Sequence, residues 1–226
     1  MDILKEIQDV TLFNGVSAEN LKLLISRAVY KKYQPGQLII GEADPIRAFY
    51  VVISGRLKLS KSSPEGKEQT LSLLGPGDPF GLCTAFATDS FPASAMAIEE
   101  SSVMIIPGEF MEAIAKKEPA LLLNIIRILS ERLKESMTLI ESLALKEIPG
   151  RLSSFLLHTL SREAGEKKNK LELTITQREL AKILGATPEA LSRTLRKMSN
   201  DGILAVEGRM MTILNRKAME SLAEGD

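Results

Sequence analysis

Apolar and polar positions follow two different periods along this chain of 226 residues. From Lys31 to about Pro107, short apolar runs such as AFYVVIS and SSVMIIP are separated by Gly and Pro. Short runs between such breaks are typical of the strands of an antiparallel barrel or sandwich. Residues 1–30 instead predict short helices, and residues 62–69 (SSPEGKEQ) predict an exposed hairpin loop.

A helical period follows from Pro119 to Leu145. A first apolar stripe, the seam, follows the heptad spacing of alternating steps of four and three, at Leu122, Ile126, Leu129, Leu133, Ser136, Ile140 and Leu143. A second apolar stripe at Leu121, Ile125 and Ile128 is suited to covering the β-rich part. Because one helix with two apolar stripes needs two partners, we expect a parallel homodimer, with packing of the seam on its own chain as the alternative.

The long helix is expected to end at residues 146–150 (KEIPG), a hinge in which Pro149 and Gly150 interrupt the helical pattern. An amphipathic helix from Arg151 and a short strand at 171–175 (LELTI) should follow. Further on, ILAVEGRMMTILN predicts two strands around a Glu-Gly-Arg turn, which is a two-stranded wing.

Residues 177–196 predict two short helices joined by a turn, with the spacing of a DNA-binding helix-turn-helix; an ordinary αα-corner is the alternative. Ala181 is small where the helices cross, Gly185 permits the bend, and Leu191 fills the angle between them. Two threonines are the expected N-caps: Thr176, with Glu179 completing a capping box, and Thr187, followed by Pro188 at the first helical position.

The composition, with 44% hydrophobic and 26% charged residues, is ordinary for a soluble globular protein. Apolar runs too short for a bilayer and an N-terminus unlike a signal peptide lead us to expect a cytoplasmic protein that does not bind a membrane. One Cys and one His provide neither a cysteine cluster nor an acid–base constellation, so an enzyme is not expected. Net charge is zero, but residues 176–217 hold 8 basic and 4 acidic side chains, which favours nucleic-acid binding there.

In this order, the segments resemble the cyclic-AMP receptor protein / fumarate-and-nitrate-reduction regulator family of bacterial transcription factors. The resemblance covers nearly the whole chain and implies an α+β fold. Its parts are a cyclic-nucleotide-binding-like antiparallel β-barrel (jelly roll), a long dimerisation helix and a winged helix-turn-helix. The motifs that carry it are GE at 41–42, FYVVISGRLKL at 49–59, GPGDPFG at 75–81, PGRL at 149–152 and the helix-turn-helix.

The implied domains are a sensor at 1–118, a dimerisation helix at 119–145 and a DNA-binding domain at 146–226. The family implies a homodimeric activator that binds palindromic promoter DNA, with RNA polymerase as a further partner and a small effector sensed by the barrel. A ligand-binding regulatory subunit of an enzyme would reuse the same barrel, but the helix-turn-helix argues against that class.

The pattern of Glu189, Ser192 and Arg193 is similar to the fumarate-and-nitrate-regulator branch, which binds TTGA-type half-sites. Arg193 suits the O6 and N7 atoms of guanine, Glu189 suits a cytosine amino group, and Ser192 would lie near the outer thymines. The Glu189 carboxylate would also stabilise the helix N-terminus by itself. Phosphate contacts are expected from Thr176, Gln177, Arg178, Thr187, Arg196 and Lys197.

The expected effector pocket departs from the cyclic-AMP pattern. Nucleotide-binding members have Gly-Glu where this chain has Gly81-Leu82, and Arg-Ser where it has Ala93-Ser94. The ribose acceptor and the phosphate cation are both missing, and no other basic residue in this part of the sequence offers a substitute. Cyclic AMP is therefore not the expected effector. Ser136 aligns with a hydroxyl that touches adenine in those members, or is a small polar residue tolerated in the seam.

Other signals stay open. Oxygen-sensing relatives carry a cysteine cluster, whereas Cys83 stands alone, so an iron–sulfur cluster is not expected. Cys83 follows PFGL, near the place where a carbon-monoxide-sensing relative has haem ligands; a small buried hydrophobe is the alternative. The only His, His158, lies outside the barrel and is expected to be structural. Redox or nitric-oxide sensing through haem and a barrel that is only a scaffold both remain.

Overall fold

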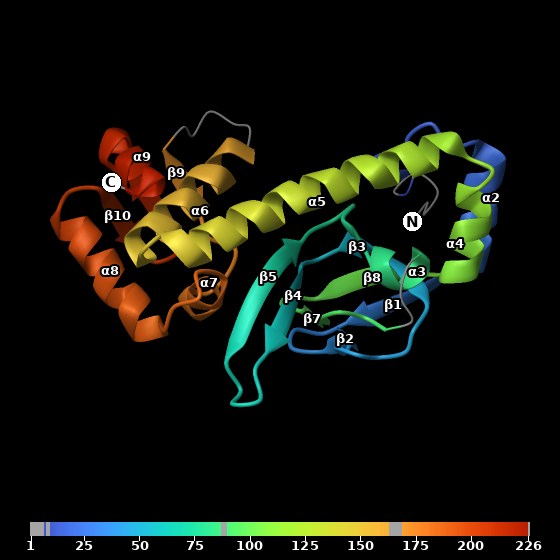
Figure 1. Cartoon of the computed structure of the whole chain (residues 1–226), viewed down its shortest axis with the longest axis horizontal. Helices are drawn as coiled ribbons and strands as arrows, with labels where there is room; N and C mark the ends of the chain where they lie inside the picture. The colour runs from blue at the N-terminus through green and yellow to red at the C-terminus, as the bar shows by residue number, and fades with distance from the viewer. Residues whose placement is uncertain (1–6, 8–9, 87–89, 163–168, 226) are drawn as a thin grey trace. The chain divides into compact units, whose positions relative to one another are not determined.

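The structure is a computed structural model that describes residue 7 and residues 10–86, 90–162 and 169–225. The chain divides into two compact units, residues 1–134 and residues 135–226. The long helix α5 (Pro119–Leu145) covers the predicted range and crosses the boundary between the two units (Figure 1).

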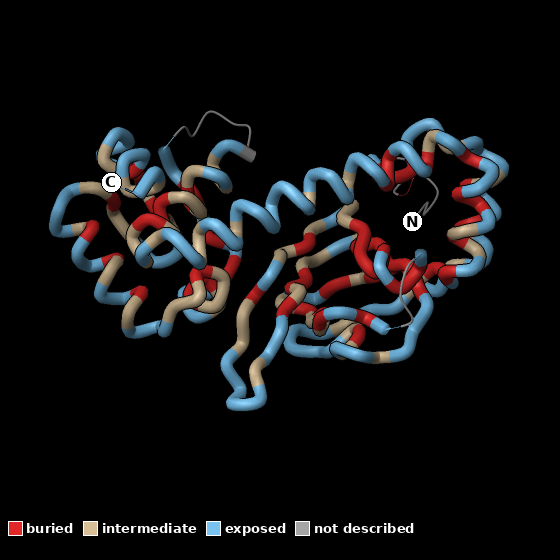
Figure 2. Tube along the Cα trace, viewed as in Figure 1, coloured by how far each residue is buried: buried red, intermediate tan, exposed pale blue. Residues whose placement is uncertain are grey.

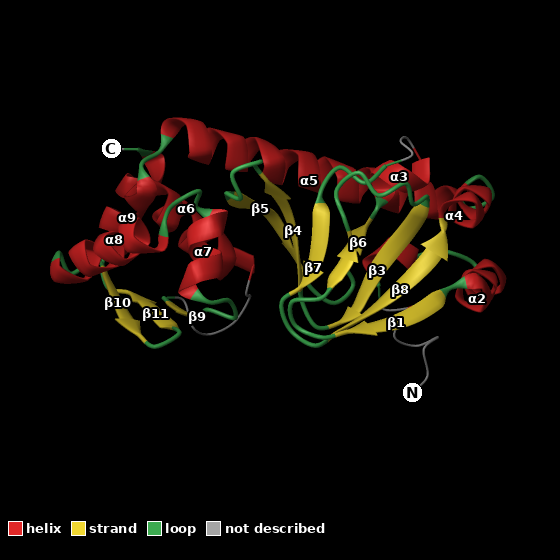
Figure 3. Ribbon diagram, turned by 90° about the horizontal axis from the view of Figure 1, so that it is seen from below, coloured by secondary structure: helices red, strands yellow, loops and turns green. Residues whose placement is uncertain are grey.

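The first unit contains two four-stranded antiparallel sheets (Figure 3). One sheet has the order β1 (Val29–Tyr33), β8 (Ser101–Pro107), β3 (Ala48–Ser54), β6 (Pro79–Phe80); the other has β2 (Leu38–Ile40), β7 (Ser94–Ala97), β4 (Leu57–Ser62), β5 (Glu68–Leu74). The predicted jelly roll is confirmed, but the predicted barrel is not closed. Among the described residues, strands pair only within each sheet, so the two sheets enclose the core by packing face to face. The predicted hairpin loop connects β4 to β5.

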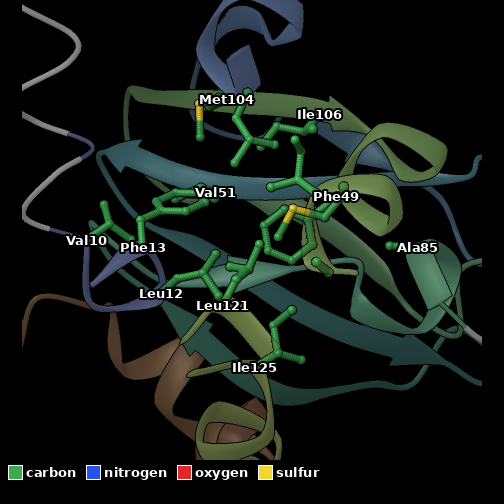
Figure 4. Close-up of a cluster of buried hydrophobic side chains, with 14 of the residues drawn as sticks. Val10, Leu12, Phe13, Phe49, Val51, Ala85, Met104, Ile106, Leu121 and Ile125 are labelled. Carbon is green, nitrogen blue, oxygen red and sulfur yellow. The ribbon is translucent and has the colours of Figure 1, made fainter. Parts of the chain in front are cut away.

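Both faces of β3 are buried, which explains why this strand is apolar from Ala48 to Ile53. Ala48, Tyr50 and Val52 face the core between the two sheets, where the ring of Tyr50 stacks on Phe80 with centroids 4.6 Å apart. Phe49, Val51 and other side chains lie in a second core beneath the helices of the unit (Figure 4). Those helices are η1 (Thr11–Phe13), α2 (Ala18–Arg27), α3 (Leu82–Phe86), α4 (Gly108–Ala115) and the first turns of α5.

The helix-side core confirms the second apolar stripe of α5, because Leu121 and Ile125 are buried there and Ile128 packs against them. Polar contacts add to this packing. The buried Asn124 donates from Nδ2 to the carbonyl oxygens of Leu12 at 3.0 Å and Asn14 at 2.8 Å. The start of α5 is thereby attached to the turn of η1.

The second unit has α6 (Ile148–Arg162), α7 (Gln177–Ile183), α8 (Pro188–Asn200) and α9 (Arg216–Glu224). It also has a sheet with the order β10 (Leu204–Glu207), β11 (Met210–Ile213), β9 (Lys170–Glu172). The wing is confirmed, whereas β9 is shorter than predicted because the chain turns after Leu173 toward the cap of α7. Helix α9, which the sequence analysis did not predict, packs on α6 (Figure 1).

Asn124→Ala should lower the free energy of unfolding by about 1–3 kcal/mol, because two carbonyl groups lose their donor in a buried environment. Urea denaturation followed by circular dichroism measures the change. Ser130→Ala is the matched control, since its hydroxyl bonds the Ile126 carbonyl of its own helix on an exposed face. Equal denaturation midpoints for the two variants would contradict the role of Asn124.

Candidate nucleic-acid interface

Helices α7 and α8 are joined by a short turn whose ends are capped as predicted. The Thr176 hydroxyl accepts from the Glu179 N–H at 3.2 Å, and the Thr187 hydroxyl accepts from the Ala190 N–H at 3.2 Å. Gly185 has φ +61°, in the left-handed region that other residues rarely adopt. Local interactions therefore determine where both helices begin and where the chain bends.

One apolar face of each helix packs inward. Ala181 and Leu191 are both buried, and the Ala186 N–H donates to the Ala181 carbonyl at 2.9 Å across the turn. The remaining buried side chains of this pair are Leu180, Leu184, Leu195 and Met198. The geometry is that of a helix-turn-helix with α8 as the recognition helix.

The outward face of α8 carries the side chains that the sequence analysis selected for DNA. All of them are exposed, as are the three selected residues at the start of α7. They are Glu189, Ser192, Arg193, Arg196 and Lys197 on α8, Thr187 at its cap, and Thr176, Gln177 and Arg178 at α7. The recognition helix thus presents cations and hydrogen-bonding groups while its apolar side is covered.

Glu189 is held at the N-terminus of α8. Hydrogen bonds from its own backbone N–H and from the Thr187 hydroxyl, together with the charge of Arg193, hold the pKa of its carboxyl below the usual value. The Thr187 hydroxyl therefore accepts from Ala190 and donates to Glu189. Both roles proposed for Glu189 from the sequence, helix stabilisation and base contact, are compatible with this position.

The wing adds an exposed cation that the sequence analysis did not select. Arg209 lies in the turn between β10 and β11, and its backbone carbonyl accepts from the Leu173 N–H at 2.8 Å. The Glu-Gly-Arg turn in the sequence could have indicated this exposed cation, because a basic residue beside a turn glycine projects from the end of a hairpin.

The five expected effector residues that lie in the first unit do not share one environment. Leu82 is buried in the helix-side core and Ala93 in the core between the sheets. Cys83 is exposed, and the Ser94 hydroxyl accepts from the Glu42 N–H at 3.1 Å. Gly81 has φ +80°, and a Cβ there would lie 2.7 Å from the Ala48 carbonyl oxygen. Ser136 is exposed in the second unit.

Two cations lie closer to this region than the sequence indicated. The Arg132 guanidinium of α5 donates to the Pro79 carbonyl, two residues before Gly81. Lys58 is buried on β4, with its ammonium 2.5 Å from the Glu68 carboxylate. The pocket segment itself contains no basic residue, and the Arg132 contact joins a residue of α5, far along the chain, to β6.

Comparison with known proteins identifies both units. Residues 30–118 match the model of the cyclic nucleotide-binding domain, and residues 150–222 match the Crp-like helix-turn-helix domain. Within the described part of the chain, no helix is long and apolar enough to span a bilayer. Together, an effector-binding domain and a DNA-binding domain are typical of transcription regulators and not of enzymes.

The names of similar proteins identify the family. The fumarate and nitrate reduction regulatory protein of Vibrio cholerae is 32% identical, over 93% of this chain and 84% of the relative. A CRP-like cAMP-activated global transcriptional regulator of Mycobacterium tuberculosis is 26% identical, over 89% and 91%. The structure of FixK2 from Bradyrhizobium japonicum has a TM-score of 0.76 at 26% identity, covering 86% of this chain and 96% of that one. The chain belongs to the Crp/Fnr family of transcription regulators.

Proposed function

We propose that this regulator is a homodimer that binds palindromic promoter sites with TTGA-type half-sites. The observation that carries the proposal is the recognition helix, whose capped N-terminus orients Glu189, Ser192 and Arg193 on one exposed face. Arg193 would donate to the O6 and N7 atoms of a guanine, and Glu189 would accept from a cytosine amino group. The remaining exposed cations of α7 and α8 would bind phosphates. RNA polymerase and a cytoplasmic location follow from the family and belong to the same proposal.

Dimerisation is supported by the uncovered stripe of α5. Leu133 and Ile140 have exposed fractions of 64% and 66% in the single chain, whereas Leu121 on the opposite stripe has 0%. Figure 2 shows long exposed stretches along α5. Leu122, Ile126 and Leu129 extend the exposed stripe at heptad spacing, and Leu143 is half-buried. An identical helix packed in parallel would cover these side chains and place the two recognition helices about 34 Å apart, one turn of duplex.

The signal is proposed to differ from cyclic AMP. Leu82 and Ala93 occupy the positions of the ribose acceptor and the phosphate cation, and both side chains are buried in apolar cores. The Mycobacterium relative is named as cAMP-activated, so family membership leaves the signal open. A redox or nitric-oxide signal is proposed by analogy with regulators that share the recognition-helix pattern.

Haem does not fit the described residues of the first unit. Cys83 is exposed, and the core between the sheets is filled by Tyr50, Phe80 and Phe91. The only His of the chain lies in the other unit. No haem-ligand role is therefore assigned to Cys83, and the redox or nitric-oxide proposal names no cofactor.

Arg193→Ala should weaken binding to a TTGA-type palindrome by about 1–3 kcal/mol and binding to random DNA very little, because a base contact acts only on the specific site. Fluorescence anisotropy with both duplexes measures the difference. Lys197→Ala is the control: loss of a phosphate contact should weaken both complexes equally. Equal losses for Arg193→Ala on both duplexes would make Arg193 a phosphate contact as well.

Replacing Leu129 and Leu133 by Glu should give a monomer in multi-angle light scattering, since the variant places like charges in the seam of the proposed dimer. Ser130→Glu with Thr138→Glu adds the same charge off the seam and should stay dimeric. A dimer of the Leu129/Leu133 variant would show that the interface lies elsewhere.

Titration calorimetry should detect no micromolar binding of cyclic AMP or cyclic GMP, because the charge-assisted partners of ribose and phosphate are absent at Leu82 and Ala93. Promoter affinity should be unchanged by either nucleotide. Micromolar binding together with tighter promoter binding would overturn the prediction. A nitric-oxide donor that leaves promoter binding unchanged would contradict the nitric-oxide version of the signal.

A further inference from the structure

Arg151, in the first turn of α6, bonds three backbone carbonyls from three segments of the second unit. Its Nε donates to Lys146 at 2.8 Å, its Nη2 to Leu143 at 3.1 Å and its Nη1 to Leu184 at 3.0 Å. Leu143 lies in the last turn of α5, Lys146 just after that helix, and Leu184 is the C-cap of α7. One guanidinium therefore joins the end of the long helix to the turn of the helix-turn-helix.

The chemistry suits arginine. The last carbonyls of a helix have no intrahelical partner and carry the negative end of the helix dipole. A guanidinium has five N–H donors in a fixed plane, so it can satisfy carbonyls of two helix ends at the same time. The compact ammonium of Lys cannot reach three separated acceptors from one position.

The surroundings of Arg151 are closely packed. Lys146 donates from Nζ to the Ser154 hydroxyl at 3.1 Å and lies 3.4 Å from the Glu141 carboxylate. A Cβ on Gly150 would lie 2.7 Å from the Leu222 carbonyl oxygen, so α6 approaches α9 with no room for a side chain. Only residues 146 and 147 separate α5 from α6. The prediction that Pro149 and Gly150 interrupt the helical pattern is therefore wrong, because residues 148–150 form the start of α6. Side-chain contacts within this unit hold the remaining link between the helices.

We infer that Arg151 is the positioning residue that sets the orientation of the recognition helix relative to the last turns of α5. Leu184 directly precedes Gly185, where the chain bends between α7 and α8. The last turns of α5 carry the seam residues Ile140 and Leu143. This inference rests on the proposed function, because in a dimer the same contact in both chains would fix the spacing of the two recognition helices.

A fixed spacing matters for a palindrome and not for a single half-site. Once one recognition helix of a dimer has bound, binding of the second half-site is intramolecular and raises the overall affinity. That increase in affinity is lost when the spacing of the two recognition helices varies. Arg151→Gln should therefore reduce affinity for the palindrome at least roughly tenfold more than affinity for one half-site. Arg151→Lys, which keeps the charge, should lie between Gln and the wild type. Arg216→Gln is the matched control, because Arg216 pairs with Glu220 of its own helix, and this change should leave the ratio unchanged.

A second measurement does not depend on DNA. Spin labels at Leu145→Cys and Asn200→Cys, in a Cys83→Ser background, report the distance between the end of α5 and the end of α8. Labelled chains are diluted with unlabelled chains so that only pairs within one chain are seen. A narrow distance distribution in the parent that broadens with Arg151→Gln, but not with Arg216→Gln, is the expected result.

The outcomes separate the two proposals. If Arg151→Gln lowers the melting temperature while both the affinity ratio and the distance distribution stay unchanged, Arg151 only stabilises the fold and the inference is wrong. If the wild type binds neither duplex, the proposed function fails, and the distance distribution alone decides the role of Arg151.

Discussion

Helix α5 has more apolar surface than its own chain covers, and this constraint organises the molecule. One stripe, with Leu121 and Ile125, closes the helix-side core of the first unit. The other stripe, with Leu133 and Ile140, stays exposed. Covering apolar side chains at heptad spacing with a second helix is favourable, so the helix that completes one core also presents the stripe that we propose as the dimer interface.

The first unit matches the cyclic nucleotide-binding domain, and we propose that Leu82 and Ala93 stand at its ribose and phosphate positions. Each of these two side chains is packed in a different core. Strand β3 lies between these cores and contributes side chains to each. A change at either position therefore affects packing as well as recognition.

The second unit depends on polar contacts at helix ends. Thr176 and Thr187 satisfy N–H groups at the starts of α7 and α8, and Arg151 satisfies carbonyls near the ends of α5 and α7. Because each contact acts at a terminus, together they determine where the helices begin, where they end and how they are joined. These contacts position α8, and the exposed side chains of α8 then form the recognition face.

Local features were predictable from the sequence by itself: the range of α5, both threonine caps, the bend at Gly185 and the wing depend on residues a few positions apart. Helix periodicity, capping and turn formation depend on residues close together in the chain, so they can be predicted from a single sequence. Other features depend on residues far apart in the chain, such as Arg132 with Pro79, Arg151 with Leu184, and the packing of α9 on α6. Only the tertiary structure decided these contacts and the open sandwich in place of a closed barrel, because neither strand closure nor the partner of a long side chain follows from periodicity.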